Sequence, residues 1–422
     1  MRLKLPVDAP DAISWLQAQP FGSQFYWHGR GEEARWAGAG VADLCSGPDG
    51  LARLAERLDV LRREGSDARY FGGMRFAPAG PSGTRWRSFG CARFVLPRFE
   101  LHEDREGCTI VLNIIPSADR LEDVLEDIHR LGEAPAGRPD SLPLPVGRID
   151  APDLAGWRQG MAGALHAFTR GALEKVVLAR RATYTFDQPL DPLALARSLE
   201  AATPSCFHFV IQPEAGTAFV GATPERLFRR EGRRAWTEAV AGTRPRGRDP
   251  VQDTTLRDEL LASEKERREH DYVADQILAA LAPFAAAREA DPIAPLALTS
   301  KWHLRTAIRA GLKDGVHTMD LLEALHPTPA VAGTPTAAAL ARIAATEPFD
   351  RGWYAGPVGW AGADAAEFAV AIRSGLVRQT ASGAALDLYS GAGIVRGSDP
   401  EAEWAEIEHK VVDFARVLGL EA

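Results

Sequence analysis

The C-terminal part of the sequence places three strand-like runs one after another, at residues 353–360, 367–377 and 385–395. Only short turn segments join them, Gly362-Ala-Asp and Thr380-Ala-Ser-Gly. Strands joined in this way pair antiparallel, because a parallel pair needs a crossover of about a dozen residues or more. The grouping favours an α+β, sandwich-like fold with large antiparallel β-sheets and flanking helices over a doubly wound α/β fold.

The first 150 residues show a similar pattern, in which turns separate short strand-like runs. Leucines at helical spacing predict one helix over 50–63. Residues 133–140, rich in proline and glycine and followed by Leu-Pro-Leu-Pro, are interpreted as a linker or long surface loop. We expect residues 1–150 and 151–422 to form one compact unit. The strand-like runs lie at residues 25–27, 69–74, 92–97 and 109–113.

The region after residue 150 contains helices as well as strands. Its elements are predicted from apolar periodicity and from cap and turn residues. They are a helix over 153–174, a strand over 175–184, a hairpin of 226–230 and 233–237 around Glu231-Gly232, a helix over 254–281, and a helix beginning at Asp399-Pro400.

Bulk properties exclude several classes of protein. The net charge of −8 argues against a dedicated nucleic-acid binder, which usually carries a basic stripe. No apolar run approaches the length of about 20 residues that spans a bilayer. The four cysteines lie far apart and form no metal-binding spacing. We therefore expect a cytoplasmic protein that binds neither nucleic acid nor membrane.

Lys175 and Glu225 are candidates for proton transfer. Lys175 opens a strand that continues Val-Val-Leu, so we expect an apolar wall beside its ammonium group, which would lower the pKa of the lysine. If Glu231-Gly232 forms a two-residue turn, Glu225 faces Glu238 across the hairpin, and each carboxylate raises the pKa of the other. The alternatives are a lysine that extends from a strand end into solvent and an ordinary charge at a strand edge.

A second group of candidates consists of carboxylates on two helices. Glu269 leans toward the buried side of its helix, and Glu403, Glu406 and Lys410 share one face of the last helix. Carboxylates from distant helices, with few nitrogen or sulfur ligands, suit a hard cation such as Mg²⁺. Acidic helix faces are also commonly just solvated, and spacing alone leaves that alternative open.

Arg373 lies within an apolar run, where a guanidinium group requires a carboxylate from the protein or from a ligand. His303 could be a donor in a pocket or a satisfied core histidine. The segments Ala241-Gly242-Thr243 and Ser390-Gly391-Ala392-Gly393 would allow backbone N–H groups to approach an anion closely.

A series of motifs gives these candidates a common context. Together, in their order, they resemble the chorismate-utilising enzymes, which include anthranilate, aminodeoxychorismate, isochorismate and salicylate synthases. The resemblance is dense over residues 153–420 and looser before. The motifs are Lys175-Val-Val-Leu-Ala-Arg, Gly221-Ala-Thr-Pro-Glu-Arg-Leu, Ala241-Gly-Thr-Arg-Pro-Arg-Gly, Ser263-Glu-Lys-Glu-Arg-Arg-Glu-His, Leu325-His-Pro-Thr-Pro-Ala-Val-Ala-Gly, Tyr354-Ala-Gly-Pro-Val-Gly, Tyr389-Ser-Gly-Ala-Gly-Ile-Val and Glu403-Trp-Ala-Glu-Ile-Glu-His-Lys.

The resemblance implies a fold of large antiparallel sheets with the active site between them. It also implies Mg²⁺ held by Glu269 and Glu406 and bound to the ring carboxylate of chorismate, with Glu403 and Glu266 at most supporting the ligands without binding the ion directly. The residues implied in substrate binding are Gly242, Thr243, His303, Ala330, Tyr354, Arg373, Gly391, Gly393 and Lys410.

Three positions distinguish branches of this family. Lys175 is similar to the lysine of water-using members, whereas ammonia-using anthranilate synthases carry glutamine there. Ala241 stands where aminodeoxychorismate synthases have a nucleophilic lysine. The stretch from His326 to Ala330 resembles isochorismate synthases, and Phe25-Tyr-Trp-His and Tyr70-Phe-Gly-Gly-Met-Arg-Phe suit the branch that serves menaquinone.

The expected activity is therefore an intramolecular hydroxyl transfer, the isomerisation of chorismate to isochorismate, with Lys175 as base and Glu225 as acid. A salicylate synthase, which continues to eliminate pyruvate, is the alternative enzyme. A catalytically inactive chorismate-binding subunit is the alternative of another class. We expect no obligatory amidotransferase partner, and a monomer or weak homodimer. The residues do not decide between a menaquinone and a siderophore pathway.

Overall fold

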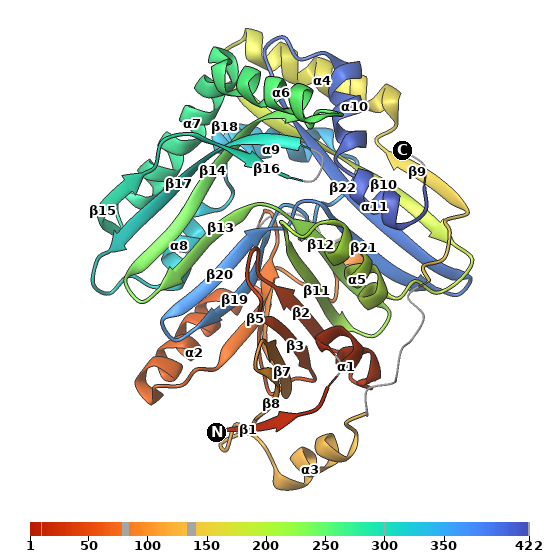
Figure 1. Cartoon of the computed structure of the whole chain (residues 1–422), viewed down its shortest axis with the longest axis vertical. Coiled ribbons are helices and arrows are strands. Elements are labelled where there is room, and N and C mark those ends of the chain that lie inside the picture. The colour runs from red at the N-terminus through yellow and green to blue at the C-terminus, as the bar shows by residue number, and fades with distance from the viewer. Residues whose placement is uncertain (10, 78–83, 133–140, 299–300, 421–422) are drawn as a thin grey trace.

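The computed structural model of the chain describes residues 1–9, 11–77, 84–132, 141–298 and 301–420. Two large antiparallel sheets dominate it, with helices on their outer faces and at one end (Figure 1). This confirms the α+β class predicted from the grouped strands. The interpretation of 133–140 as a linker falls outside the described residues.

The first sheet has 12 strands and draws on both halves of the chain. Its strands in order are β1 (Arg2–Val7), β8 (Gly107–Asn113), β7 (Phe99–Asp104), β3 (Arg35–Ala39), β2 (Gln24–His28), β11 (Phe207–Glu214), β12 (Thr217–Thr223), β21 (Ser374–Thr380), β22 (Gly383–Val395), β10 (Lys175–Phe186) and β18 (Gly333–Thr334), with β9 (Gly147–Ala151) also paired to β10.

The second sheet has 10 strands and likewise mixes early and late segments. Its order is β15 (Ala285–Ala290), β17 (Lys301–Leu312), β14 (Arg234–Pro245), β13 (Arg226–Glu231), β20 (Ala365–Val370), β19 (Pro357–Gly362), β5 (Arg69–Met74), β6 (Ala92–Leu96) and β4 (Asp43–Ser46), with β16 (Ala294–Ala297) also paired to β17.

The helices form where the sequence has apolar residues at helical spacing and a capping residue at the start. Asp153, Asp249, Ser263 and Asp399, for example, each cap the first turn of a helix through a side-chain oxygen. Among the described residues, no helix is both long and apolar enough to cross a membrane. The helices are α1 (Ala12–Ala18), α2 (Gly50–Glu64), α3 (Leu121–His129), α4 (Leu154–Thr169), α5 (Pro192–Ala202), α6 (Pro250–Ala262), α7 (Glu264–Leu281), α8 (Thr318–Leu325), α9 (Thr336–Thr346), α10 (Pro400–His409) and α11 (Val412–Val417), with a 3₁₀ turn η1 at Thr84–Trp86.

The core follows the alternation of side chains along the strands. On β11, Phe209 belongs to the large apolar cluster between the sheets, whereas its neighbour Val210 belongs to a second cluster under α1, α5 and α11. Phe25 of the first sheet meets Phe71 of the second with ring centroids 4.2 Å apart. Burial of both faces explains why these strands read as nearly continuous apolar runs rather than as a strict alternation.

Two predicted helices differ from the structure, one in its end and one in its continuity. The helix predicted over 153–174 ends at Thr169, and a turn at Gly171, with a φ of +70°, precedes β10. The helix predicted over 254–281 is in fact two helices, α6 and α7. Ser263 separates them, because it adopts an extended conformation and its hydroxyl caps α7 by accepting from the N–H of Glu266.

The strand predicted over 367–377 is also divided, because the chain leaves the second sheet after β20 and enters the first sheet at β21. The expected C-terminal meander is thus two hairpins in different sheets, β19–β20 and β21–β22. Arg373 lies at the crossing and has a φ of +50°. Apolar periodicity did not reveal the crossing, since both strands and the link between them are buried.

A second crossing runs beside the first. The chain passes from β12 of the first sheet to β13 of the second, with Glu225 in the link. Backbone hydrogen bonds join the two crossings, from the N–H of Ala222 to the carbonyl of Arg373 and from the N–H of Val370 to the carbonyl of Glu225, both at 3.0 Å. The hydroxyl of the fully buried Thr223 donates to the carbonyl of Val370 at 2.7 Å. The two links are therefore hydrogen-bonded to each other, which fixes the backbone at Glu225 and at Arg373.

Replacing Thr223 by valine should destabilise the hydrogen-bonded pair of links, while the side chain at this position keeps its shape. The variant loses a buried hydrogen bond, which we expect to cost about 1–3 kcal/mol of unfolding free energy. The urea-unfolding midpoint measures the effect. The matched control is Thr254→Val on the exposed face of α6, with an expected change within about 0.5 kcal/mol. Equal midpoints for the two variants would contradict the proposed role of the Thr223 hydroxyl.

Candidate active site

One cavity of about 550 Å³ brings the predicted site residues together. A larger cavity, about 790 Å³, lies between β9 and the helices α10 and α11, but no predicted site residue lines it. Convergent titratable groups, rather than volume, therefore mark the first cavity as the candidate site. Its lining includes Lys175, Glu225, Gly242, Thr243, His303, Ala330, Tyr354, Arg373, Gly391, Gly393, Lys410, Glu266, Glu269, Glu403 and Glu406.

The walls of this cavity come from both sheets. β10 and β22 of the first sheet contribute Lys175, Gly391 and Gly393, and β14 and β17 of the second contribute Gly242 and His303. Helix α7 packs against β14, and α10 packs against β22, so each sheet brings one carboxylate-bearing helix to the site (Figure 1).

Lys175 differs from its prediction in one respect. Its side chain is mostly buried at the start of β10, but Nζ donates to Oε1 of Glu269 at 2.8 Å instead of facing only apolar groups. Gly393, on the neighbouring strand, leaves room for the lysine, since a Cβ there would lie 3.0 Å from Cε of Lys175. The expected apolar wall is therefore wrong in part, because α7 brings a carboxylate into contact with the ammonium group.

Glu225 has a carboxyl group whose pKa is raised to about 7. Burial is the largest cause and repulsion from Glu238 the second, while Lys175 and Lys410 act in the opposite direction. A carboxyl group with this pKa is largely protonated just below neutral pH, as a general acid requires.

The predicted hairpin register behind this arrangement is wrong. Glu231 pairs with Arg234, so the turn is Gly232-Arg233, and Glu225 precedes β13 rather than facing Glu238 directly. The positive φ of Gly232, +58°, favours glycine at the first position of this turn. Glu238 is near Glu225 nonetheless, since it accepts from the backbone N–H of Arg226 at 3.3 Å.

An arginine from the N-terminal part supports Glu238. Arg30, in the link between β2 and β3, pairs with Glu238 at 2.8 Å and also donates to the carbonyl of Pro224. The sequence did not single out Arg30, because no local pattern relates it to Glu225 almost 200 residues away. Arg244 and Arg396 line the cavity, and the sequence did not single them out either.

Three of the four glutamates expected at the metal site form an ion pair with a cation. Glu269 pairs with Lys175, and Glu406 pairs with Lys410 at 2.6 Å. Burial raises the pKa of Glu403, whose neighbours include Glu406. Glu266 pairs with Arg244 at 3.1 Å. The donors are carboxylate oxygens from α7 and α10, a set that suits a hard divalent cation.

Other groups that line the cavity suit an anion. Arg373 has one carboxylate nearby, Asp413, at 3.7 Å, which leaves its guanidinium group able to accept a second partner. Nζ of Lys410 donates to the carbonyl of Gly391 at 2.8 Å. Tyr354 is buried beside Gly391, where a Cβ would lie 3.1 Å from the tyrosine hydroxyl. Gly391 therefore keeps this hydroxyl uncovered.

Backbone strain is concentrated in this cavity. Within the described residues, Ala355 and Arg373 are the non-glycine residues with positive φ, 61° and 50°, and both line the cavity. Such conformations cost on the order of 1–3 kcal/mol each and persist where the surrounding structure enforces them. Here the backbone hydrogen bond from the N–H of Ala355 to the carbonyl of Ala371 joins the two segments.

His303 is a pocket residue with a fixed ring. Burial lowers its pKa to about 3, with Arg373 as the next cause, so the ring is neutral at physiological pH. Its Nδ1 lies 3.1 Å from the carbonyl of Gly242 and 3.1 Å from the hydroxyl of Thr243. A proton on Nδ1 that is donated to Gly242 leaves Nε2 as an acceptor. Gly242 sits at a bulge of β14 and has a φ of +73°.

With this geometry in place, comparison with known proteins gives the family. Residues 1–419 match the family described as "Chorismate binding enzyme". The chain belongs to the chorismate-binding enzyme family. The match begins at residue 1, so the N-terminal part, where the resemblance was looser, is included.

Individual relatives agree with this assignment. The isochorismate synthase MenF of Pasteurella multocida is 33% identical over 408 residues, which are 96% of this chain and 90% of that protein. The solved structure of MenF, the menaquinone-specific isochorismate synthase of Escherichia coli, superimposes with a TM-score of 0.88 at 32% identity and covers 99% of this chain and 94% of that one.

Anthranilate synthase component I of Streptococcus pneumoniae shares the fold alone. Its structure superimposes with a TM-score of 0.70 at 19% identity and covers 99% of this chain and 92% of that one. The fold thus extends to a protein that is only distantly similar in sequence.

The raised pKa of Glu225 predicts a pH-dependent effect on stability. Because the folded protein binds this proton more tightly than the unfolded chain, whose glutamates titrate near 4.5, stability is lost as pH rises from there through about 7. In metal-free protein, Glu225→Gln should raise the melting temperature by several degrees at about pH 8 and by much less at about pH 5. Glu259→Gln, on the exposed face of α6, is the control and should change neither value. A variant melting below the wild type at the higher pH would contradict the raised pKa.

Proposed function

We propose that this protein is an isochorismate synthase that isomerises chorismate to isochorismate. The observation that carries the proposal is the joint presence of Lys175 and Glu225 in one cavity, with the pKa of Glu225 raised to about 7. An acid that is protonated near neutral pH and an amine in the same pocket can serve the two faces of a ring. The names of the relatives, isochorismate synthases that cover nearly the whole chain, support the same activity.

In the proposed reaction, Lys175 takes a proton from a water molecule that attacks C2 of chorismate. Glu225 donates its proton to the C4 hydroxyl group, which leaves as water while the ring double bonds shift. One water is added and one is lost, so the net change is an isomerisation. Glu238, held by Arg30, keeps the proton on Glu225 until the leaving group accepts it.

The base role requires the neutral form of Lys175. In the structure Glu269 accepts a hydrogen bond from Nζ at 2.8 Å. A ligand role for Glu269 would withdraw its negative charge from Lys175. The contact between Lys175 and Glu269 would therefore link metal binding by Glu269 to the neutral form of the proposed base.

We propose that Glu269 and Glu406 hold Mg²⁺, with Glu403 beside them. The oxygen donors of these side chains, their origin on two helices and their position in the cavity suit the ion. Bound there, Mg²⁺ would supply positive charge for the ring carboxylate of chorismate. Lys410 and Lys175, the present partners of the two glutamates, stay close enough to contribute to substrate binding.

Arg373 and Tyr354, with the backbone at Gly391 and Gly393, are proposed to bind the enolpyruvyl carboxylate. The guanidinium group already lies 3.7 Å from one carboxylate, Asp413, and has donors for another. Gly242, Thr243 and His303 would contact the ring side. Two fixed carboxylates would leave the ring with little freedom to rotate, which converts most of the catalytic problem into positioning.

Product analysis tests the proposed activity. Incubation with chorismate and Mg²⁺ should give an equilibrium mixture of chorismate and isochorismate, and chelation of the metal should abolish turnover. Detection by chromatography separates the candidates. Salicylate and pyruvate formed without an added lyase would select the salicylate synthase alternative, and absence of any turnover would favour an inactive binding subunit. The menaquinone pathway is our proposed destination for the product, because the E. coli neighbour is menaquinone-specific.

Kinetics of two variants test the acid and the base. Lys175→Ala and Glu225→Gln should each lower kcat by about 10²–10⁴, the usual contribution of general acid–base groups, with a smaller change in KM. Lys265→Ala, a cavity-lining lysine to which no proton transfer is assigned, is the control and should retain kcat within about tenfold. Retention of turnover within about threefold by either catalytic variant would rule out the assigned mechanism.

A further inference from the structure

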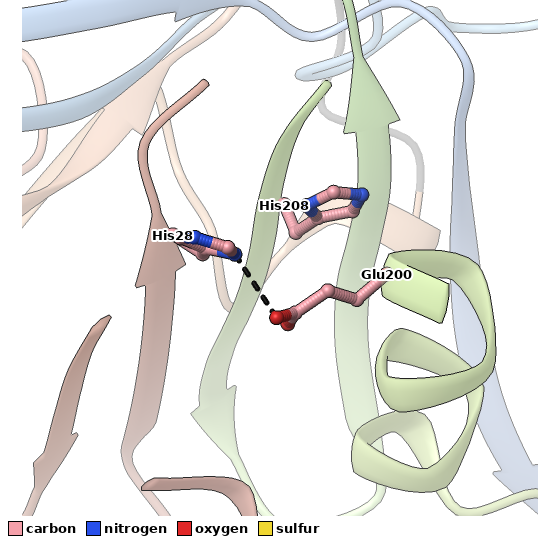
Figure 2. Close-up of side chains that lie close together, drawn as sticks. All are labelled: His28, Glu200 and His208. Atoms are coloured by element: carbon pink, nitrogen blue, oxygen red, sulfur yellow. Dashed lines mark ion pairs between the residues drawn. The ribbon is translucent and has the colours of Figure 1, made fainter. Parts of the chain in front are cut away.

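A cluster of His28, Glu200 and His208 lies outside the active-site cavity, on the face of the first sheet that α5 covers. His28 on β2 and His208 on β11 are directly paired in the sheet, and Glu200 reaches them from α5 (Figure 2). One ligand atom from each of the three side chains lies within 4.8 Å of the other two. None of the three lines the active-site cavity.

His208 presents an unpartnered nitrogen lone pair. The side chain is 1% exposed, and its Nε2 lies 3.0 Å from the hydroxyl oxygen of Thr203. That hydroxyl already donates to the carbonyl of Leu199 at 2.6 Å, so Nε2 must carry the proton and donate to Thr203. Burial lowers the pKa of His208 to about 4, so the ring is neutral. Its Nδ1 is therefore a buried acceptor without a hydrogen-bond partner.

His28 presents the same atom. Its Nε2 lies 2.8 Å from the carbonyl of Glu32, which can only accept, so Nε2 carries a proton there as well. Its Nδ1 lies 3.0 Å from Oε1 of Glu200. Without a metal ion, Nδ1 carries a proton that it donates to Glu200, a contact that raises the pKa of His28 despite its burial. A divalent cation would take the place of this proton. A hydrogen bond from the remote nitrogen to a carbonyl or hydroxyl oxygen is the usual support of a metal-binding histidine.

Glu200 is held in place by hydrogen bonds from Tyr26 and from two N–H groups of Arg35. Tyr26 donates to Oε2 at 2.5 Å, and Arg35 donates to Oε1 at 2.8 Å. Arg35 also pairs with Glu103 at 3.2 Å, so a second carboxylate balances its charge. Once a metal ion has replaced the proton on His28, both histidines are neutral, and Glu200, Glu103 and Arg35 together carry a net negative charge that the ion offsets.

We propose that His28, Glu200 and His208 form a binding site for a divalent transition-metal ion, with Zn²⁺ as its reference occupant. Two imidazole nitrogens and one carboxylate oxygen are a typical ligand set for zinc, with further positions left for water. Mg²⁺ prefers oxygen ligands and would remain in the active-site cavity. The side chains of His28 and Glu200 are each 15% exposed, which gives an ion access from solvent.

Zinc titration followed by calorimetry tests this site, with Co²⁺ absorption as a second readout. The titrated parent protein is a variant with the substitutions Glu269→Gln and Glu406→Gln, so that the proposed Mg²⁺ site does not contribute to zinc binding. We expect about one equivalent of Zn²⁺ to bind and Co²⁺ to give visible bands of low-symmetry nitrogen and oxygen coordination. His208→Gln and His28→Gln should each weaken zinc binding by at least about 100-fold, since loss of a group that only orients a ligand already costs 10- to 100-fold.

His166→Gln, at an exposed position of α4, is the matched control and should bind zinc like the parent. Circular dichroism and melting temperature establish that each variant is folded, and His28→Gln, the less buried change, serves if His208→Gln does not fold. Zinc binding that survives both ligand variants, or absence of binding by the parent at micromolar Zn²⁺, would overturn the proposal. If the parent does not bind zinc, the contact between His28 and Glu200 is explained by a proton on Nδ1 of His28 alone.

Discussion

The two crossings between the sheets are the constraint on which the site depends. A chain that leaves one sheet and enters the other must change direction within a few residues, and here it does so at Glu225 and again at Arg373. Hydrogen bonds from Ala222 to Arg373 and from Val370 to Glu225 fix the two links side by side. Because rigid strands begin on each side, the proposed acid and the proposed carboxylate receptor are held by backbone rather than by flexible loops.

Electrostatic balance is the second organising feature. The cavity collects cations and anions in pairs, such as Lys175 with Glu269 and Lys410 with Glu406. Glu225 forms no such ion pair among the described residues, and burial and repulsion from Glu238 favour its protonated form. Bringing a paired set of charges into a partly buried site costs less free energy than burying isolated ones, and a dianionic substrate with a divalent cation can exchange partners with such a set. The unpaired group is the one to which the reaction assigns a proton.

The N-terminal part takes part in both sites. Arg30, two residues beyond β2, supports Glu238 behind the proposed acid, and His28, on β2 itself, belongs to the separate histidine cluster. The link from β2 to β3 thus lies between the cavity and the outer face of the first sheet. This arrangement gives the first 40 residues a role beyond completion of the sheets.

The sequence by itself determined the fold class, the positions of several elements and the membership of the cavity. Strands without intervening helices can pair only antiparallel, and the ordered motifs brought all predicted site residues to one place. The functional roles of these residues are still predictions. Local patterns help to bring these residues together. Gly393, for example, leaves room for the side chain of Lys175, and Asp399 caps the start of α10.

Only the tertiary structure decided the division of 367–377 between two sheets, the turn at Gly232-Arg233, the break at Ser263, and the contacts of Lys175 with Glu269 and of Arg30 with Glu238. Local periodicity records whether a side chain is buried, but not which sheet buries it. A contact between residues 100 or 200 positions apart leaves no periodic trace in either segment. The pairing of His28 with His208 belongs to the same class, since their register is set by the whole sheet.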